Sequence, residues 1–354
     1  MSHLSARKGF AVVLYPYGKP AARRGPAAPD MTVDRAVDGY LAATAARHKR
    51  STHAAYERVA ERHIRPALGP YPVSGLTAER LADFLAEKSA GTDGEPALAP
   101  STVCGIITVL RAVLRYAEGR GCAVNAWAGL ERPRPVTRPA EVLTWSEQRE
   151  LAAFLVREED PIRLGVLLCL YTGLRLGEVC ALKWGELSAD GSVLSVRRTV
   201  QRIRAQGPGE QVKKTSVVFD RPKSQNALRA IPLPAFLRPR LDRLRGGSGC
   251  FLLTGTDKPL EPRVMQNHFK ALLRQAGVRE VNFHCLRHTF ATSCVELGFD
   301  PKTVSMIFGH ADVSVTLNTY VHPSFSKLRS CMEGLGPGLS AVPFPGDDIG
   351  SQIL

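Results

Sequence analysis

One stretch decides the fold that we expect: His284-Cys285-Leu286-Arg287-His288-Thr289-Phe290, continued to Gly298. Helical spacing of i, i+3 and i+4 puts the polar His284, Arg287 and His288 on one face. The opposite, apolar face carries Leu286, Phe290, Cys294 and Leu297. Gly298 predicts the end of this helix. A histidine that can shuttle protons beside an arginine that can fix oxygens suits an anionic ligand, although ordinary packing explains this pattern about equally well.

The segment after this helix contains two further candidate residues. Asp300 predicts the cap of a short helix that ends at Gly309-His310. Tyr320 lies ten residues beyond His310. A single tyrosine near the end of a domain is usually a packing residue, so Tyr320 alone indicates no chemistry.

Two weaker signals precede the deciding stretch. In Thr172–Glu178 an apolar helix ends at a glycine, and Arg175 lies at the turn into the next helix. An arginine and a glutamate three residues apart normally form a structural ion pair, and we expect Glu178 to be such a partner rather than a catalyst. Lys223, in Pro222-Lys223-Ser224, falls between two predicted strands, and a lysine at a hairpin tip is normally only solvated.

The chain before residue 131 predicts an arm followed by a helical bundle. Residues 1–30 hold five basic side chains and one acid, which is typical of a basic flexible arm. Residues 31–130 predict four amphipathic helices. Their expected starts are Thr32, about Ser51, Thr77 and Ser101, with the second helix stopping at Pro66 and the fourth before Gly119.

The second half of the chain predicts a separate domain. Residues 131–140 are rich in proline and arginine and predict a linker. Thr144-Trp145-Ser146-Glu147 is a capping box that begins a new helix. We therefore expect a second domain over 141–333, followed by a loose tail over 334–354. It is helical except for three alternating segments that predict a small antiparallel sheet: Ser192–Ile203, Thr215–Asp220 and Arg229–Leu233.

Composition limits the class of protein. The 354 residues carry a formal charge of +14, which attracts polyanions such as nucleic acid or merely keeps the protein soluble. Eight scattered cysteines without a C-x-x-C pair predict neither a disulfide framework nor a zinc site. The apolar runs Phe10–Tyr15 and Val166–Tyr171 are too short for a signal peptide or a membrane span. We therefore expect a cytoplasmic protein with no membrane partner.

Taken in order, the motifs R…K…H-x-x-R…G-H…Y resemble the catalytic signature of the tyrosine recombinase (phage integrase) family. The matching positions are Arg175, Lys223, His284, Arg287, His310 and Tyr320. The run from His284 to His322 is most similar to integrases of conjugative transposons and prophages, and the likeness covers about residues 31–333. Phe308 stands where the family usually has leucine, which keeps an apolar anchor at that position.

The resemblance implies a mainly α fold. An all-α core-binding (SAM-like) bundle would occupy residues 31–130. A mixed, mostly helical catalytic domain with a small antiparallel β-sheet would occupy residues 141–333. Together they would form a C-shaped clamp around duplex DNA. Related integrases often carry a separate N-terminal domain before the bundle. Residues 1–30 are too short for one, so we expect an arm that contacts phosphates with little reading of sequence.

The resemblance also assigns roles to the matching residues. Tyr320 would be the nucleophile and would form a 3′-phosphotyrosyl link. Arg175 and Arg287 would clamp the non-bridging oxygens of the phosphate, because planar guanidinium groups suit phosphate. His310 would donate a further hydrogen bond to it.

Two other residues would transfer protons. His284 would assist proton movement at the tyrosine hydroxyl, and Lys223 would protonate the leaving 5′-oxygen. No cluster of acidic residues accompanies these groups, so the sequence predicts no metal and no cofactor. His288 and His322 are expected to be supporting residues.

The implied function is site-specific DNA recombination that integrates or excises a mobile element or prophage. Its partners would be double-stranded DNA, three further copies in a homo-tetramer on two DNA sites, and DNA-bending or excision accessory proteins. Three alternatives remain open: a Xer-like chromosome dimer resolvase, a type IB topoisomerase-like nicking-closing enzyme, and a catalytically silent DNA-binding protein on the same fold. The silent protein is disfavoured because all six positions hold the required residue types.

Overall fold

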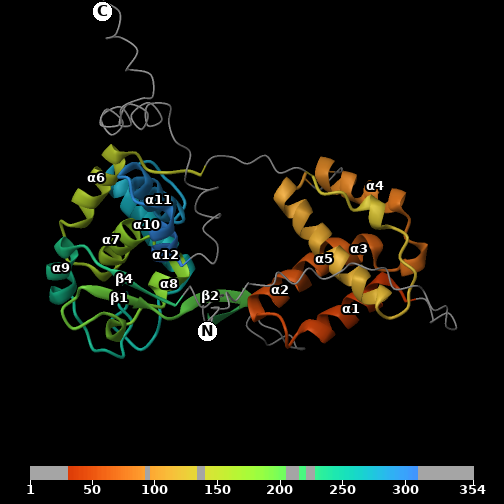
Figure 1. The fold of residues 1–354 in the computed structure, drawn as a ribbon, viewed down its shortest axis with the longest axis horizontal. Coiled ribbons are helices and arrows are strands. Elements are labelled where there is room, and N and C mark those ends of the chain that lie inside the picture. The colour runs from red at the N-terminus through yellow and green to blue at the C-terminus, as the bar shows by residue number, and fades with distance from the viewer. Residues whose placement is uncertain (1–30, 92–95, 134–139, 205–214, 221–227, 310–354) are drawn as a thin grey trace, which may run out of the picture. The chain divides into compact units, whose positions relative to one another are not determined.

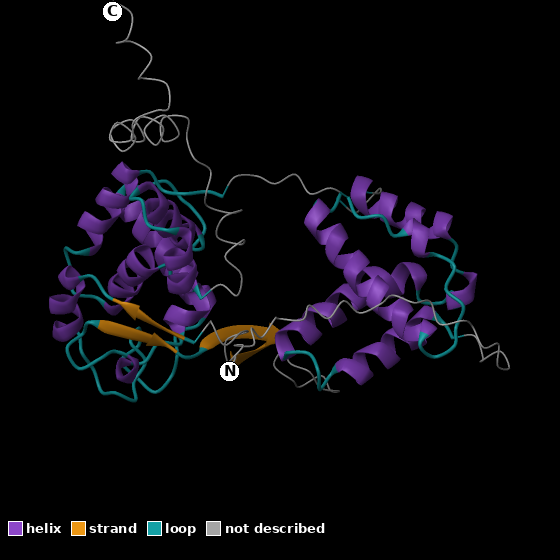
Figure 2. Ribbon diagram, viewed as in Figure 1, coloured by secondary structure: helices purple, strands orange, loops and turns teal. Residues whose placement is uncertain are grey.

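The computed structural model describes residues 31–91, 96–133, 140–204, 215–220 and 228–309. The chain divides into two compact units, Met1–Val136 and Thr137–Leu354 (Figure 1). The division falls within the segment for which the sequence predicts a linker. Among the described residues helices dominate, and the strands belong to the second unit (Figure 2). The predicted fold class, mainly α with a small antiparallel β component, is confirmed.

The first unit is a helical bundle. Its elements are α1 (Val33–Thr44), α2 (Arg50–Val59), α3 (Arg65–Leu68), α4 (Ala78–Ala90) and α5 (Pro100–Glu118), with 3-10 turns at Val73–Gly75 and Trp127–Gly129. The predicted caps at Thr32 and Thr77 are confirmed, since each side chain accepts a hydrogen bond from a backbone N–H three residues later. The longest helix, α5, opens at Pro100, one residue before the predicted start. It buries the apolar face that its sequence predicts.

The predicted stop at Pro66 is wrong. Helix α2 continues into a π-helical stretch, Ala60–Ile64, and then into α3, which contains Pro66 in its first turn. In the π-helical stretch the Arg65 N–H reaches the carbonyl of Ala60, five residues back. A proline is tolerated at the start of a helical segment because its missing N–H would lack an intrahelical acceptor there.

The second unit contains eleven described helices and strands, besides 3-10 turns at Trp184–Glu186 and Ala235–Leu237. The helices are α6 (Trp145–Leu155), α7 (Pro161–Thr172), α8 (Leu176–Cys180), α9 (Arg238–Arg243), α10 (Pro262–Ala276), α11 (Cys285–Glu296) and α12 (Pro301–Phe308). The strands are β1 (Val193–Val196), β2 (Thr199–Arg204), β3 (Thr215–Asp220) and β4 (Arg229–Pro232).

Helix α7 forms the centre of this unit, because nine of its 12 residues are buried. Helices α6, α8, α10 and α11 pack against it, and Figure 1 shows α6, α7, α10 and α11 on one side of the strands β1 and β4. Within the described part of the chain, no helix is long and apolar enough to cross a membrane.

Local signals predict several ends of these helices. Thr144 and Glu147 form the predicted capping box at the start of α6. Asp300 caps α12, which ends at Gly309 in the left-handed conformation. The prediction for Leu297 is wrong, since this side chain is 65% exposed rather than part of the buried face of α11. It lies at the C-cap, beyond the last turn of the helix.

The predicted single sheet is instead a pair of two-stranded antiparallel ribbons. Strand β1 pairs with β4, and β2 pairs with β3. Two residues separate β1 from β2, whereas eight residues, 221–228, separate β3 from β4. Strands β3 and β4 therefore do not pair with each other. The predicted position of Lys223 at a hairpin tip lies outside the described residues.

Gly173, which ends α7, has two constraints that only glycine meets. Its φ is +65°, and an added Cβ would lie 2.8 Å from ring atoms of Phe290 and of Phe308. Gly277, which ends α10, has a φ of +70°, and an added Cβ there would have no neighbour within 4 Å. The two glycines share a backbone conformation and differ in the space around them.

We expect Gly277→Ala to lower the free energy of unfolding by about 1–2 kcal/mol, the cost of a left-handed alanine. Gly173→Ala should lower it by roughly 2–5 kcal/mol, since overpacking adds to that cost. Urea unfolding followed by tryptophan fluorescence measures both values. Equal losses in the two variants would show that the aromatic rings do not confine Gly173.

Candidate active site

Three of the six predicted site residues lie within the described part of the chain: Arg175, His284 and Arg287. The other three, Lys223, His310 and Tyr320, lie outside the described residues. The described residues of the candidate site therefore come from α7, α8, β4, α11 and α12.

Arg175 lies at the turn between α7 and α8, as the sequence predicts. It is the N-cap residue of α8, and its side chain is 37% exposed. Its backbone N–H donates to Glu178 Oε2 at 2.9 Å, and its Nη1 donates to Glu178 Oε1 at 2.7 Å. Glu178 thus caps the first turn of the short helix α8, and its carboxylate holds the Arg175 guanidinium beside it.

Glu178 is buried and binds a second arginine, Arg229, at the start of β4. Burial alone would raise the pKa of Glu178, but hydrogen bonds and charges from Arg229 and Arg175 outweigh it and lower that pKa to about 2. Glu178 is therefore ionised at neutral pH, as the predicted structural partner of nearby positive groups. Sequence reasoning did not single out Arg229. An arginine at the start of an otherwise apolar strand was the available signal.

Helix α11 presents two histidines close to Arg175. His284 lies at its N-cap, and its ring packs edge-on against that of His288, with 4.6 Å between centroids. Desolvation of the ring, followed by the positive charges of His288, Arg287 and Arg175, lowers the pKa of His284 to about 4. The residue retains exposed surface. A neutral, accessible imidazole can accept a proton.

Arg287 lies on the same helix as the two histidines but is buried, with only 2% of its surface exposed. Its Nη1 donates to the carbonyl of Gly173 at 2.6 Å, and its Nη2 donates to the carbonyl of Phe308 at 3.1 Å. The guanidinium carbon also lies 4.0 Å from the centroid of the Phe308 ring. Arg287 therefore brings together the end of α7, the first turn of α11 and the end of α12.

The arrangement has the chemistry of an anion site. Three guanidinium groups, those of Arg175, Arg229 and Arg287, accompany one ionised carboxylate, Glu178. The remaining positive charge favours a bound phosphate or a developing negative charge. In the described ranges, no group of three or more His, Cys, Asp or Glu side chains is placed to hold a metal ion.

Comparison with known proteins decides the family. A sequence model of the phage integrase family matches residues 141–327, which is more than half of the chain. The chain belongs to the phage integrase family. These are tyrosine recombinases, enzymes that break and rejoin DNA strands, and the resemblance inferred from the ordered motifs is confirmed.

The relatives of this integrase-family chain include proteins of two kinds. A XerC-like tyrosine recombinase of Caldanaerobacter subterraneus subsp. tengcongensis is 32% identical over 257 residues, which cover 66% of this chain and 65% of that protein. The transposase of transposon Tn916 from Enterococcus faecalis is 25% identical over 219 residues, which cover 56% of this chain and 52% of that protein. The chain thus spans about half to two thirds of these relatives.

Solved structures share the fold. The integrase of transposon Tn1549, in complex with transposon right end DNA, has a TM-score of 0.67 and 23% identity, covering 86% of this chain and 99% of that one. A lambda integrase tetramer bound to a Holliday junction has a TM-score of 0.58 and 20% identity, covering 84% of this chain and 81% of that one. These similarities establish the fold of the family member described here.

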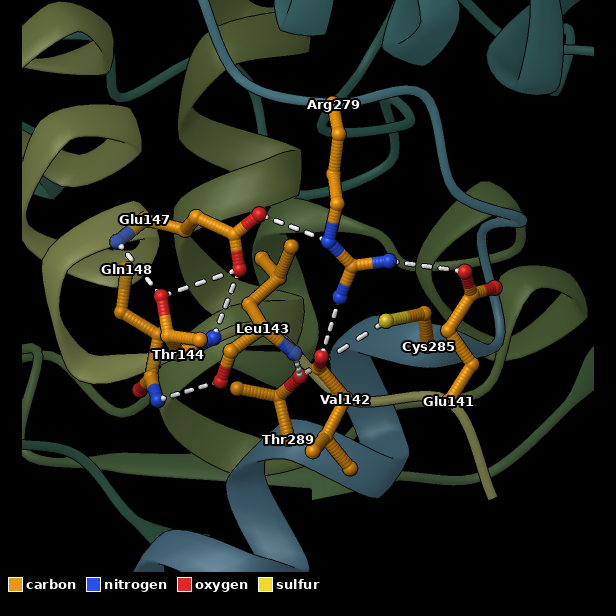
Figure 3. A network of polar contacts seen from close by, with 9 residues as sticks. All are labelled: Glu141, Val142, Leu143, Thr144, Glu147, Gln148, Arg279, Cys285 and Thr289. Atoms are coloured by element: carbon orange, nitrogen blue, oxygen red, sulfur yellow. Dashed lines mark hydrogen bonds and ion pairs between the residues drawn. The ribbon is translucent and has the colours of Figure 1, made fainter. Parts of the chain in front are cut away.

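The side of α11 away from the histidines is anchored to the start of the second unit (Figure 3). The buried hydroxyl of Thr289 accepts a hydrogen bond from the backbone N–H of Leu143 at 2.9 Å. Ser293 donates to Gln148 at 3.2 Å, and the indole of Trp145 donates to Glu296 at 2.7 Å. Side chains about one helical turn apart on α11 therefore bind three residues around the start of α6.

Arg279 completes this network. Its Nε donates to Glu147 at 2.6 Å, its Nη1 donates to Glu141 at 2.8 Å, and its Nη2 donates to the carbonyl of Val142. Figure 3 shows the guanidinium between the two carboxylates. The residues that precede α6 are thus fixed on both sides, by Arg279 and by Thr289. The sequence patterns did not identify this anchor.

We expect Thr289→Val to destabilise the protein by about 1–3 kcal/mol, because valine keeps the shape but leaves the buried Leu143 N–H without its acceptor. Thr289→Ser keeps the hydroxyl and should retain that hydrogen bond. Hydrogen exchange at the Leu143 amide gives the measurement, with faster exchange in the valine variant than in the serine variant. Unchanged protection in the valine variant would contradict the assigned bond.

We expect the His284 imidazole to stay neutral down to about pH 4, below its ordinary value of 6.5. Since the folded state disfavours the protonated form, His284 should reduce stability progressively as pH falls from 6.5 towards 4. Histidine NMR titration measures the midpoint, and the signal lost in His284→Gln gives the assignment. A midpoint at or above 6.5 would refute the depressed pKa.

Proposed function

We propose that this chain is a site-specific DNA recombinase that cleaves and rejoins strands through a covalent 3′-phosphotyrosyl link at Tyr320. One observation carries the proposal: in a chain of the phage integrase family, Arg175 from the turn before α8 lies near His284 and Arg287 from the start of α11. The convergence of two guanidinium groups and a neutral imidazole supports attack on a phosphodiester, where charge must be neutralised and a proton moved.

In the proposed step, the Tyr320 oxygen bonds to phosphorus, and the bond from phosphorus to the 5′-oxygen breaks. The tyrosine proton passes to His284, which is unprotonated at neutral pH and becomes a stronger proton acceptor when the negative phosphate lies beside it. Lys223 supplies the proton that the leaving 5′-oxygen requires. Arg175, Arg287 and His310 bind the non-bridging oxygens. The energy of the broken bond is kept in the phosphotyrosyl link, so rejoining needs no nucleotide cofactor.

The proposed substrate is double-stranded DNA, bound by a core-binding domain over 31–130 and a catalytic domain over 141–333. The basic arm, 1–30, would add phosphate contacts, and 334–354 would form a tail. We propose a homo-tetramer on two DNA sites, supported by the fold shared with the lambda integrase tetramer on a Holliday junction. DNA-bending or excision proteins would act as accessory factors, and the reaction would take place in the cytoplasm.

The proposed biological role is integration and excision of a mobile element. The Tn916 transposase relative and the fold of the Tn1549 integrase support it. The XerC-like relative favours a second candidate, resolution of chromosome dimers. Sequencing around the gene distinguishes the two: direct repeats flanking an element indicate integration, whereas an isolated gene without them indicates resolution. A topoisomerase-like enzyme would relax supercoils without joining two sites.

The test uses Tyr320→Phe and a nicked suicide duplex that carries one of the flanking repeats, called here the core duplex. We expect covalent attachment to be abolished while non-covalent binding stays nearly unchanged, because only the nucleophilic oxygen is lost. Gel separation under denaturing conditions measures attachment, and mobility shift measures binding. Tyr116→Phe, a change in the first unit, is the matched control. A covalent complex with the Tyr320 variant would exclude this residue as the nucleophile.

A further inference from the structure

Arg229 is not one of the six signature positions, yet it contacts two of the segments that build the site. Its Nη1 donates to Glu178 Oε1 at 3.1 Å, and its Nη2 donates to Glu178 Oε2 at 2.8 Å. Its Nε donates to the carbonyl of Ile307 at 2.6 Å. One guanidinium therefore joins β4 to α8 and to the last turn of α12.

These bonds matter for the stability of the site because both partners are buried. The side chains of Arg229 and Glu178 are only 5% and 3% exposed. A buried ion pair is held in place only when its geometry is good and its remaining hydrogen-bonding groups are satisfied. Each oxygen of the Glu178 carboxylate accepts one hydrogen bond from Arg229 and one from Arg175. Its position is therefore fixed from both sides.

The charges explain why two arginines surround one carboxylate. If Arg175 alone faced Glu178, its positive charge would be neutralised by that carboxylate. Because Arg229 forms a bidentate pair with Glu178, one net positive charge remains for Arg175 to present to an anion. The exposures agree with this division, since Arg229 is buried whereas the Arg175 side chain is 37% exposed.

We propose that Arg229 is a positioning residue for strand cleavage: it orients and neutralises Glu178, and Glu178 in turn holds Arg175 toward the scissile phosphate. This inference rests on the proposed function, which gives Arg175 its role as a phosphate ligand. A lysine cannot replace Arg229, because an ammonium group on a flexible stem lacks the planar fork that binds both carboxylate oxygens and a carbonyl at once.

The Arg229–Glu178 ion pair also predicts how loss of Arg229 should change the pH dependence of cleavage. The charged or titratable groups near Glu178 are Arg175 from the turn before α8, Arg229 from β4 and the Cys169 thiol from α7. Burial raises the pKa of Cys169, so the thiol is neutral. Without Arg229, burial should raise the pKa of Glu178 above its present value. Cleavage should then fall off at a higher pH on the acid side than in the unchanged protein.

The experiment measures single-turnover cleavage of the core duplex by the full chain as a function of pH. We expect Arg229→Gln to slow cleavage on the order of 10²-fold, a loss typical of a displaced catalytic group, with little change in mobility-shift binding. Arg229→Lys should recover only part of the rate. Arg243→Gln, which removes an arginine paired with Glu159 on the surface, is the matched control and should cleave normally.

A double variant separates positioning from simple loss of structure. Arg229→Gln with Glu178→Gln removes both buried charges, so no charge is left buried without its partner. The double variant therefore tests whether Arg229 acts through Glu178 even if the single arginine variant folds poorly. If Arg229 acts through Glu178, the double variant should cleave no more slowly than Glu178→Gln alone. Losses that multiply in the double variant would overturn the proposal.

Other outcomes separate this inference from the proposed function. If Arg175→Ala abolishes cleavage while Arg229→Gln cleaves normally with an unshifted pH profile, the positioning role is refuted and the recombinase function stands. If the Arg175 and Tyr320 variants both still cleave, the proposed function itself fails.

Discussion

The buried guanidinium of Arg287 is the interaction on which the rest of the site depends. A charged group with 2% exposure is stable only when its donors are satisfied. In the described structure its acceptors are main-chain carbonyls at the ends of two helices, Gly173 and Phe308. The carbonyl end of a helix carries partial negative charge, which favours a cation. The same residue therefore satisfies two helix ends and fixes the distance between them.

The two segments held by Arg287 are those that lead to the other candidate groups. Gly173 precedes Arg175 by two residues, and Phe308 is followed by Gly309-His310. Arg229 links the same two regions through Glu178 and the carbonyl of Ile307. Two buried arginines thus hold the end of α12, Arg287 against the end of α7 and Arg229 against α8. Breaking a buried ion pair costs about 3–5 kcal/mol when one charge is left alone, so these contacts hold the described parts of the site firmly together.

The features that could be predicted from sequence are those whose partners lie within a few residues. Thr32, Thr77, Thr144 and Asp300 each bond a backbone N–H two or three residues ahead, so the local motif contains the whole interaction. The apolar face of α5 follows from helical periodicity in the same way. The ordered motifs also indicated the family, since each catalytic residue type has its own chemical requirement.

The features that could not be predicted depend on distant partners. Arg229 and Glu178 are 51 residues apart, and Leu143 and Thr289 are 146 residues apart. Periodicity says which face of a helix is polar but not what covers it, so the burial of Arg287 could not be predicted from its helical position. The two ribbons were expected as one sheet because strand alternation gives no register and does not say which strands pair.

Helix α11 has both kinds of feature, those that its own sequence predicts and those that depend on distant partners. Its first turns carry His284 and Arg287, whereas Thr289, Ser293 and Glu296 bind residues around the start of α6. Because α11 carries reactive groups on one side and hydrogen-bonded anchors on another, it cannot rotate without breaking the contacts on one of these sides. Its amphipathic pattern is weak for this reason, since polar residues are required on buried as well as open sides. Thr289 follows Arg287 by two residues, so one helix holds both the start of the second unit and the candidate phosphate site.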